Sequence, residues 1–266
     1  MNLVLQGSSL TESQAKALGP AQRIADHAWR IRGATSVDTA WCEKNRIDHA
    51  FVPEGRRFAD LKLVAMDMDS TLITMETIDE LGDLVGRKPE IAAITARAMR
   101  GEIDYPESLR QRVSLLAGLD EQGLLDVYEN RLRLTAGAET LIAACKKHGV
   151  KMLLVSGGFT FFVERLKARL GIDYTVSNTL EIADGRLTGR VLGDVVDAEA
   201  KAVKFRQVTA GLKKEQTVAI GDGANDLKMM AEAGLSVAFH AKPVVRAQAS
   251  CAISWCGLDA VPNLFE

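Results

Sequence analysis

The sequence predicts an α/β protein built around a parallel sheet. Three apolar runs, at residues 61–66, 150–155 and 217–221, each lead directly into polar or glycine-rich residues. Buried parallel strands have this continuous apolar character, and ligand sites in open α/β sheets lie beyond the carboxyl ends of the strands. Helical patterns alternate with the runs, which favours parallel pairing. We therefore expect a functional site where the three runs end.

The helical segments of this core follow the runs in order. We expect helices at residues 138–148, 161–170, 198–210 and 226–233. Gly149 stands at the usual stop position after the first of them. Asp184-Gly185 lies between two short strand candidates and is a good hairpin signal. Residues 235–254 supply two more short strands, with Lys242-Pro243 marking the turn between them.

The chain divides into three regions. Residues 61–73 and 134–266 form the predicted α/β core. Residues 74–133 are helical in pattern and interrupt the core just after its first strand, so we interpret them as a small helical cap. Residues 1–60 carry no chemical motif and contain a mildly amphipathic helix candidate at residues 12–32. Their role stays open among a regulatory ligand-binding module, dimerisation and simple packing.

The composition indicates a cytoplasmic enzyme. The 266 residues carry a net charge of -2, with 35 acidic against 33 basic side chains, which gives no reason to expect nucleic acid or membrane binding. No segment approaches the roughly 20 apolar residues of a membrane span, and the amino terminus lacks the features of a signal peptide. The four cysteines have no zinc-site spacing, so we expect reduced thiols. The expected partner is a small-molecule substrate, and a homodimer stays open.

Asp67 and Asp69 follow the first apolar run, two positions apart. Side chains alternate along a strand, so the two carboxylates leave the sheet on the same side. They repel each other unless a cation lies between them or one of them keeps its proton. The pattern therefore indicates a metal site, an acid–base pair or both. The alternative is an Asx turn with a capping Ser70 or Thr71.

The ends of the other two runs also carry groups that suit phosphate or magnesium. Ser156-Gly157-Gly158 ends the second run, the segment 222–226 ends the third, and Lys201 lies between them. Small residues let the backbone approach an anion closely, and Mg²⁺ prefers oxygen ligands such as carboxylates. Taken singly, each motif has a plainer interpretation as an ordinary turn or a solvated lysine. Three such strand ends in one chain would not often assemble by chance.

In this order the motifs resemble the haloacid dehalogenase superfamily of phosphotransferases, over residues 62–240. The resemblance implies a Rossmann-like core sheet with the helical segment as its cap. It implies that Asp67 is the nucleophile, which forms an aspartyl-phosphate, and that Asp69 is the general acid and base. Lys201 would place a positive charge against the phosphoryl group.

The resemblance also implies a magnesium cofactor. The family's ligands correspond to the Asp67 side chain, the Asp69 backbone carbonyl and the Asp222 side chain. Asp226 most resembles a group that orients metal-bound water or Lys201. The implied phosphate-binding residues are Ser156, Gly157, Lys201 and Asn225.

Within the superfamily, the match is closer to the branch that acts on O-phospho-L-serine. Glu76 matches the residue that binds the substrate ammonium, and Arg112 the one that binds the carboxylate, because a guanidinium pairs two donors with two oxygens. We take the neighbouring Arg110 to be exposed. Tyr105 stands where the branch usually has Phe, which keeps an aromatic wall and adds a hydroxyl.

The activity that we expect is the hydrolysis of O-phospho-L-serine to L-serine and phosphate, the last step of phosphorylated serine biosynthesis. One alternative is another small phosphomonoester such as phosphohomoserine, which would use Glu76 and Arg112 differently. A second is a regulatory binding protein that has lost catalysis. The intact Asp67 and Asp69 argue against this second alternative, because loss of activity usually shows first at those groups.

Overall fold

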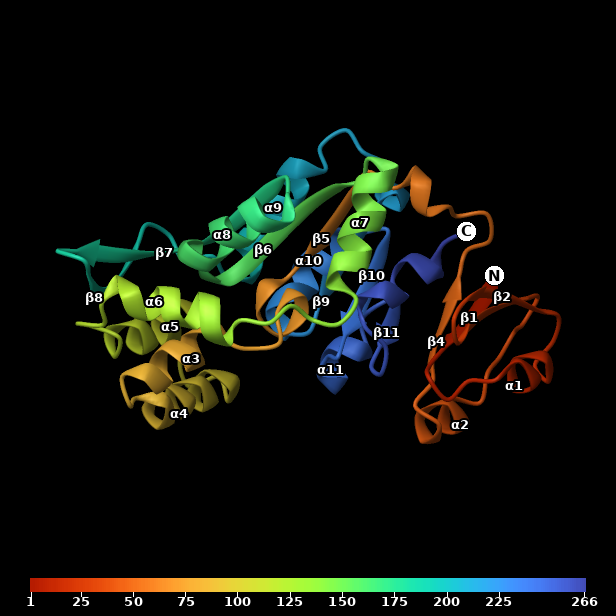
Figure 1. Cartoon of the computed structure of the whole chain (residues 1–266), viewed down its shortest axis with the longest axis horizontal. Coiled ribbons are helices and arrows are strands. Elements are labelled where there is room, and N and C mark those ends of the chain that lie inside the picture. The colour runs from red at the N-terminus through yellow and green to blue at the C-terminus, as the bar shows by residue number, and fades with distance from the viewer.

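The computed structural model describes all residues from Met1 to Glu266 and contains two β-sheets. The central sheet has seven strands in the order β11-β10-β9-β5-β6-β7-β8, and a second sheet has four in the order β2-β3-β1-β4. Figure 1 shows the central sheet in the middle of an elongated molecule, with the four-stranded sheet at one end and helices α3 to α6 at the other. None of the helices has the length and apolar character needed to span a bilayer.

The central sheet is parallel except for its edge strand β8, so the predicted α/β fold is confirmed. Lys242-Pro243, predicted as a turn, begins the short helix α11 (Pro243–Arg246). The strands of the sheet are β5 (Leu63–Met66), β6 (Lys151–Phe159), β7 (Tyr174–Ala183), β8 (Arg186–Leu192), β9 (Thr217–Gly221), β10 (Leu235–Phe239) and β11 (Cys251–Ile253).

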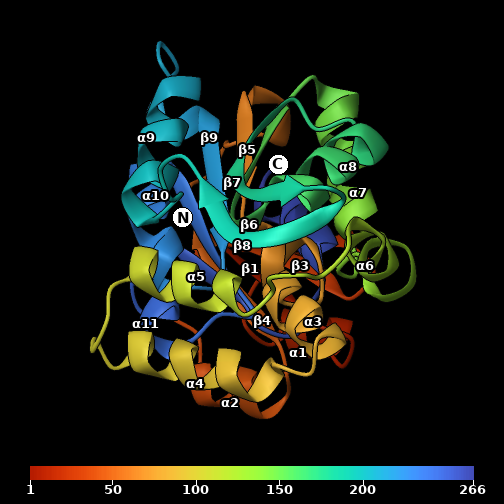
Figure 2. The ribbon, with the colours of Figure 1, turned by 90° about the vertical axis from the view of Figure 1, so that its left-hand side faces the viewer.

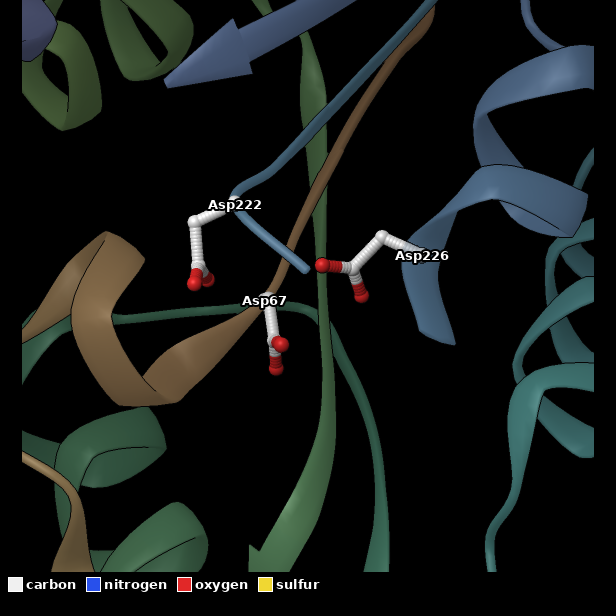
Figure 3. Close-up of side chains that lie close together, drawn as sticks. All are labelled: Asp67, Asp222 and Asp226. Atoms are coloured by element: carbon white, nitrogen blue, oxygen red, sulfur yellow. The ribbon is translucent and has the colours of Figure 1, made fainter. Parts of the chain in front are cut away.

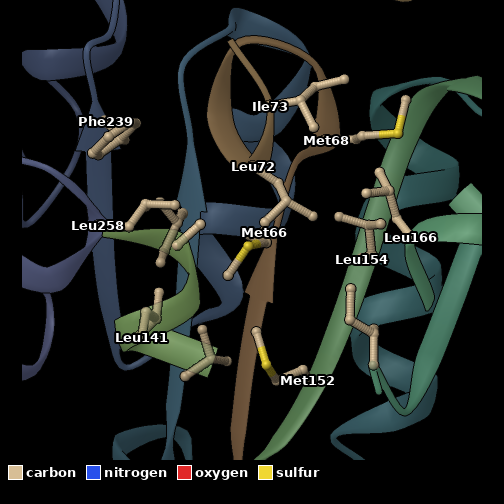
Figure 4. Packing of buried hydrophobic residues seen from close by; sticks show 14 of the residues in the cluster. Met66, Met68, Leu72, Ile73, Leu141, Met152, Leu154, Leu166, Phe239 and Leu258 are labelled. Carbon is tan, nitrogen blue, oxygen red and sulfur yellow. The ribbon is translucent and has the colours of Figure 1, made fainter. Parts of the chain in front are cut away.

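Helices cover both faces of this sheet, because its strands are apolar on both sides. Val64 and Met66 of β5 pack on the face that carries α7 (Ala138–His148) and α8 (Thr160–Leu170), and Figure 4 shows part of this core. The alternate residues Leu63 and Ala65 pack on the opposite face. That face carries α9 (Ala198–Val208) and α10 (Leu227–Glu232), and Figure 2 shows the two helix pairs on either side of the sheet.

The register of the parallel strands brings the ends of β5 and β9 level with the residues of β6 that precede Ser156. Met66, the last residue of β5, lies opposite Leu154 of β6 and Ile220 of β9. The amide of Asp67 continues the pairing by donating to the Ile220 carbonyl at 3.1 Å. The motifs that follow the three runs therefore begin at the same level, at the carboxyl edge where α/β proteins bind ligands.

The segment between β5 and β6 forms a helical layer over this edge. Its two connections to the core lie side by side, because the Thr74 amide donates to the Arg133 carbonyl and the Thr135 amide to the Leu72 carbonyl, each at 3.0 Å. We call the four helices of this layer the cap. They are α3 (Thr77–Leu84), α4 (Lys88–Met99), α5 (Tyr105–Ser114) and α6 (Glu121–Asp126).

The β7–β8 hairpin reaches from the core to the cap (Figure 2). Asp184 and Gly185 form its two-residue turn with φ of +51° and +73°, as their sequence predicts. Leu187 of β8 accepts a hydrogen bond from the Gly118 amide and donates one to the Leu119 carbonyl, each at 2.8 Å. Backbone hydrogen bonds therefore connect the cap to the edge of the central sheet.

The amino-terminal region is a four-stranded antiparallel sheet with two short helices, and the helix predicted at residues 12–32 is wrong beyond Lys16. Gly19 and Pro20 end that helix, and the following residues pair as the β2–β3 hairpin. Four of the five residues of β3 are buried, on both of its faces, so an alternating pattern is absent. The elements are β1 (Asn2–Gln6), α1 (Glu12–Lys16), β2 (Ala21–Ala25), β3 (Ala28–Arg32), α2 (Thr39–Lys44) and β4 (Asp48–Val52).

Candidate active site

A cavity of about 430 Å³ lies between the carboxyl edge of the central sheet and the cap. Three residues predicted for the site, Ser156, Lys201 and Asp226, are fully buried behind its wall. The predicted residues in the wall itself come from both sides: Asp67, Asp69, Gly157, Asp222 and Asn225 from the core, and Glu76, Tyr105 and Arg112 from the cap and the segment leading into it. The fold thus brings together residues spread over most of the chain.

Lys201 is completely buried, so its interpretation as a solvated lysine is wrong. Its Nζ lies 2.8 Å from Oδ2 of Asp67 and 2.8 Å from Oδ1 of Asp226. Burial opposes the charged form of Lys201, but the carboxylates of Asp226 and Asp67 outweigh burial and raise the pKa of Lys201 above its ordinary value. Asp197 accepts from the Ala200 amide at 2.9 Å and caps α9, the helix that carries Lys201.

Asp67, Asp222 and Asp226 form a carboxylate cluster in which one oxygen of each lies within 4.8 Å of the others. Figure 3 shows Asp67, which follows β5, close to Asp222 and Asp226, which belong to the segment after β9. Both oxygens of Asp226 are engaged, one by Lys201 and the other by the Gly223 amide at 3.1 Å. Asp67 is engaged by Lys201 and by the Met68 amide at 2.7 Å, whereas Asp222 keeps one oxygen without a hydrogen bond. Asp67 and Asp222 line the cavity and Asp226 does not, so these two carboxylates are the ones that a further ligand can reach.

The charge balance of this cluster fits a divalent cation. Three carboxylates share the single positive charge of Lys201, which leaves an excess of negative charge. Burial, followed by the nearby Asp226 and Glu76, raises the pKa of Asp222 to about 6. A metal ion relieves such repulsion, and a set of carboxylate oxygens suits Mg²⁺.

Asp69 lies on the cavity wall and has the environment of a proton donor. Burial, and after it the charge of Glu76, raises the pKa of Asp69 to about 7. The carboxylate of Asp67 is turned toward Lys201, and its own pKa is raised by burial, by Asp226 and, to a smaller extent, by the charge of Asp69. The Thr77 amide donates to Asp69 at 2.8 Å and holds its carboxyl in place.

The irregular end of β6, at residues 156–158, brings backbone close to Asp69, and we call these residues the Ser156 loop. The Ser156 hydroxyl accepts from the Gly158 amide at 2.8 Å and donates to Asp69 at 3.4 Å. A Cβ on Gly158 would lie 2.6 Å from Oδ2 of Asp69, and a Cβ on Gly157 would lie 2.3 Å from the Tyr105 hydroxyl oxygen. A Cβ at either position would therefore displace the Asp69 carboxyl or the Tyr105 hydroxyl, and glycine avoids this.

Asn178 supports this loop and was not among the residues predicted for the site. Its side chain is buried, donates to the Gly157 carbonyl at 2.8 Å and accepts from the Val196 amide at 2.8 Å. The Tyr105 hydroxyl donates to the same Gly157 carbonyl at 3.1 Å, which connects the cap to the loop. The only signal in the sequence is an amide side chain within a strand, where Asn is disfavoured.

The cap presents charged groups of both signs to the cavity. Glu76 lies at the start of α3 and accepts from the Ser70 hydroxyl at 2.6 Å. Arg112 of α5 is half-buried and lies beside the Tyr105 ring, with 5.9 Å from its guanidinium carbon to the ring centroid. Arg110 is exposed and does not line the cavity, as we expected. An anion and a cation thus lie opposite the core carboxylates.

A parallel α/β core that places carboxylates and a buried lysine at its carboxyl edge, under a helical cap, defines an enzyme that acts on small anionic substrates. Residues 64–231 match the haloacid dehalogenase-like hydrolases, and the chain belongs to that family. The resemblance seen in the sequence is thereby confirmed.

Within that family, the chain is similar to proteins named phosphoserine phosphatase. A phosphoserine phosphatase of Polaromonas sp. is 56% identical over 217 residues, which cover 79% of this chain and 92% of the relative. The crystal structure of a probable phosphoserine phosphatase from Vibrio cholerae is 37% identical, with a TM-score of 0.85 over 99% of this chain and 86% of that one. A phospho-aspartyl intermediate analogue of phosphoserine phosphatase is 39% identical, with a TM-score of 0.72 over 77% of this chain and 99% of that one.

Proposed function

We propose that this protein hydrolyses O-phospho-L-serine to L-serine and phosphate, the last step of phosphorylated serine biosynthesis. The observation that carries the proposal is one cavity with two chemically different walls. The core wall has carboxylates backed by a lysine, which suit a metal-assisted phosphoryl group, and the opposite wall has Glu76 and Arg112 for an ammonium and a carboxylate. The named activity of the Polaromonas relative supports the same substrate.

In the first step, Asp67 is the nucleophile. A carboxylate oxygen of Asp67 forms a bond to phosphorus while the bond between phosphorus and the serine oxygen breaks. Asp69 gives its proton to that oxygen, which leaves as the hydroxyl of L-serine. A pKa of Asp69 raised to about 7 by burial and by Glu76 keeps part of this group protonated at neutral pH. The phospho-aspartyl analogue of a relative supports this route.

In the second step, Asp69 is ionised and accepts a proton from water. The water oxygen attacks phosphorus, the bond to Asp67 breaks, and phosphate leaves. Lys201, held between Asp67 and Asp226, offsets the negative charge that gathers on the phosphoryl oxygens. The remaining phosphate contacts come from Ser156, Gly157 and Asn225.

The Asp67 and Asp222 side chains and the Asp69 backbone carbonyl would hold Mg²⁺, which would supply positive charge to offset the repulsion between the nucleophile and the phosphoryl group. Asp226 acts through Lys201, because its carboxylate is fully buried behind the cavity wall and bonds to Lys201 and to the Gly223 amide. This assignment of ligands rests on the carboxylate cluster and its excess of negative charge.

Substrate selection is the task of the cap. Glu76 accepts hydrogen bonds from the substrate ammonium, and Arg112 donates two to its carboxylate. Tyr105 forms the wall between them, fixed by its hydrogen bond to Gly157. Burial raises the pKa of Tyr105 to about 12, so its hydroxyl stays a donor at neutral pH.

We also propose a cytoplasmic enzyme that binds no nucleic acid, which the near-zero net charge supports. For the homodimer, the supporting feature is β2, an open edge of the four-stranded sheet at which a second copy can pair. Light scattering of the purified protein decides between monomer and dimer.

Phosphate release from a panel of small phosphomonoesters tests the proposed function. The panel contains O-phospho-L-serine, O-phospho-L-threonine, phosphohomoserine and an aryl phosphate, each with Mg²⁺ and then with a chelator. We expect metal-dependent turnover with a strong preference for O-phospho-L-serine. Turnover without that preference would support a phosphatase but contradict O-phospho-L-serine as its substrate. No turnover of any ester would favour a binding protein.

A further inference from the structure

Ser108 lies on the face of α5 that lines the cavity. Tyr105, Ser108, Leu109 and Arg112 all belong to the cavity wall, at spacings of three, four and seven residues along the helix. Residues at these spacings share one face of an α-helix. Ser108 thus stands between the aromatic ring and the guanidinium to which substrate recognition is assigned above.

The hydroxyl of Ser108 is buried and has no hydrogen-bond partner. A buried serine in a helix often bonds to the carbonyl four residues earlier. Here the carbonyl of Asp104 accepts from the backbone amide of Ser108, and the hydroxyl makes no bond. A buried polar group without a partner costs free energy, so its presence requires an explanation. The other unpartnered buried side-chain atoms lie in β1 and β3, and none of their residues lines this cavity.

The neighbourhood of Ser108 indicates which ligand group would satisfy the hydroxyl. Nε of Arg112 donates to the Ser108 carbonyl at 3.3 Å, so the guanidinium and the hydroxyl lie one helical turn apart. A carboxylate has about four lone-pair sites and keeps some free after pairing with a guanidinium. The phosphate contacts are on the core wall, whereas Ser108 is on the cap wall beside Arg112.

We propose that Ser108 is a specificity-determining residue, whose hydroxyl donates a hydrogen bond to the substrate carboxylate alongside Arg112. This inference rests on the proposed function and adds a residue to its substrate site. The binding of substrate supplies the partner that the hydroxyl lacks. The hydroxyl therefore contributes to the recognition of phosphorylated amino acids and contributes nothing to esters without a carboxylate.

The test compares Ser108→Ala with wild type on O-phospho-L-serine and on O-phosphoethanolamine, which keeps the ammonium and lacks the carboxylate. We expect kcat/KM for O-phospho-L-serine to fall about tenfold, mainly through KM, and kcat/KM for O-phosphoethanolamine to change less than about twofold. Where O-phosphoethanolamine turnover is too slow to measure, the inhibition constants of L-serine and inorganic phosphate are compared instead. We expect Ser108→Ala to raise the inhibition constant of L-serine and to leave that of phosphate unchanged. Ser114→Ala is the matched control, because Ser114 is exposed on the same helix and bonds only to the Gln111 carbonyl.

Thermal unfolding separates this role from a structural one. Ser108→Ala removes a hydroxyl that makes no bond in the free protein, so we expect Tm to stay level or rise. A clear fall in Tm, or equal losses on both substrates, would overturn the inference, and so would unchanged selectivity. If wild type fails to hydrolyse O-phospho-L-serine at all, the proposed function fails first, and that result is distinct from unchanged selectivity in the variant.

Discussion

At the scale of single residues, the chemistry depends on where each charge is buried. Lys201 has no contact with water and stays protonated because two carboxylates lie 2.8 Å away. Asp69 and Asp222 have raised pKa values, about 7 and about 6, mainly because burial disfavours their ionised forms. The same residue types on an open surface would have neither property.

Replacing the nucleophile should abolish turnover. In Asp67→Asn the amide cannot form an acyl phosphate, so we expect phosphate release to fall by roughly a thousandfold or more and no phosphorylated protein to form. Trapping with radiolabelled substrate after acid quenching measures the intermediate. Asp60→Asn is the control, because Asp60 is exposed and pairs only with Arg57. Full turnover in Asp67→Asn would show that another group is the nucleophile.

Magnesium affinity should depend on pH. The pKa of Asp222 is raised to about 6 in the metal-free protein by burial and by Asp226 and Glu76, so protons compete with the ion as pH falls. From Asp222 alone we expect affinity to fall by roughly tenfold between about pH 8 and about pH 5. Titration calorimetry without substrate measures it. An affinity that is constant across this range would contradict the assignment of Asp222 as a ligand.

Arg112 and Arg110 form a natural pair for testing recognition of the carboxylate. Arg112→Ala should lower kcat/KM for O-phospho-L-serine by roughly a hundredfold. It should change kcat/KM for an aryl phosphate by only about a few-fold, because only O-phospho-L-serine has a carboxylate. Arg110→Ala should change neither, since Arg110 is exposed and outside the cavity. Equal losses on both substrates would mean that Arg112 serves the phosphate or the fold of the cap.

At the scale of elements, the position of the cap depends on the β7–β8 hairpin. Leu187 bonds to the backbone at Gly118 and Leu119, and the Arg186 guanidinium donates to the Gly118 carbonyl at 2.7 Å. The base of the same hairpin carries Asn178, which holds the loop at Gly157. One element therefore connects the Ser156 loop of the core with the helices of the cap.

Two glycines test this connection. Gly189 and Gly193 both have positive φ, +84° and +71°, but only a Cβ on Gly189 would contact the cap, 3.0 Å from Cβ of Ala117 and 3.2 Å from the Ser114 carbonyl oxygen. Both alanine variants incur backbone strain of about 1–2 kcal/mol. Only Gly189→Ala should also raise KM for O-phospho-L-serine, because it displaces the hairpin from the cap. Steady-state kinetics with thermal unfolding measure both effects, and equal KM values in the two variants would contradict the role of the hairpin.

At the scale of the whole molecule, the amino-terminal sheet is part of the main body. Val4, Ala50 and Val52 pack in the same core cluster as the central sheet. On its other face the sheet has a small core of its own, around Leu3 and Ile31. The final residues of the chain are held against this sheet and the segment after it, as Figure 1 shows for the two termini.

Asp48 makes three hydrogen bonds between the amino-terminal sheet and the core. Its buried carboxylate accepts from the amides of Ser254, Trp255 and Cys256, at 2.7, 3.1 and 2.9 Å. Asp48→Ala leaves these amides without their acceptor and should lower the free energy of unfolding by about 2 kcal/mol. Denaturant unfolding measures it. Asp26→Ala is the control, because Asp26 is exposed in the same sheet and should cost less than about 0.5 kcal/mol. Similar losses in both variants would contradict the role of Asp48.

The sequence was informative where structure follows from local pattern. Helices α7 to α10 and the turn at Asp184-Gly185 are close to their predicted positions, because periodicity and turn chemistry depend on neighbours in the chain. The prediction of a helix at residues 12–32 was wrong beyond Lys16, because a local pattern does not include contacts with distant segments. β3 is buried on both faces by segments distant in the sequence, including the carboxyl-terminal residues to which Arg30 donates, and no local pattern contains them.

By itself, then, the sequence determined the kind of chemistry: carboxylates, glycines and a lysine at the ends of apolar runs, in an order that identified the family. The tertiary structure decided what depends on partners far apart in the chain. It placed Lys201 between Asp67 and Asp226, Asn178 against Gly157, and the unpartnered hydroxyl of Ser108 in the cavity wall. Burial and hydrogen-bond satisfaction are properties of the packed chain, so only folding gives these side chains their functional environment.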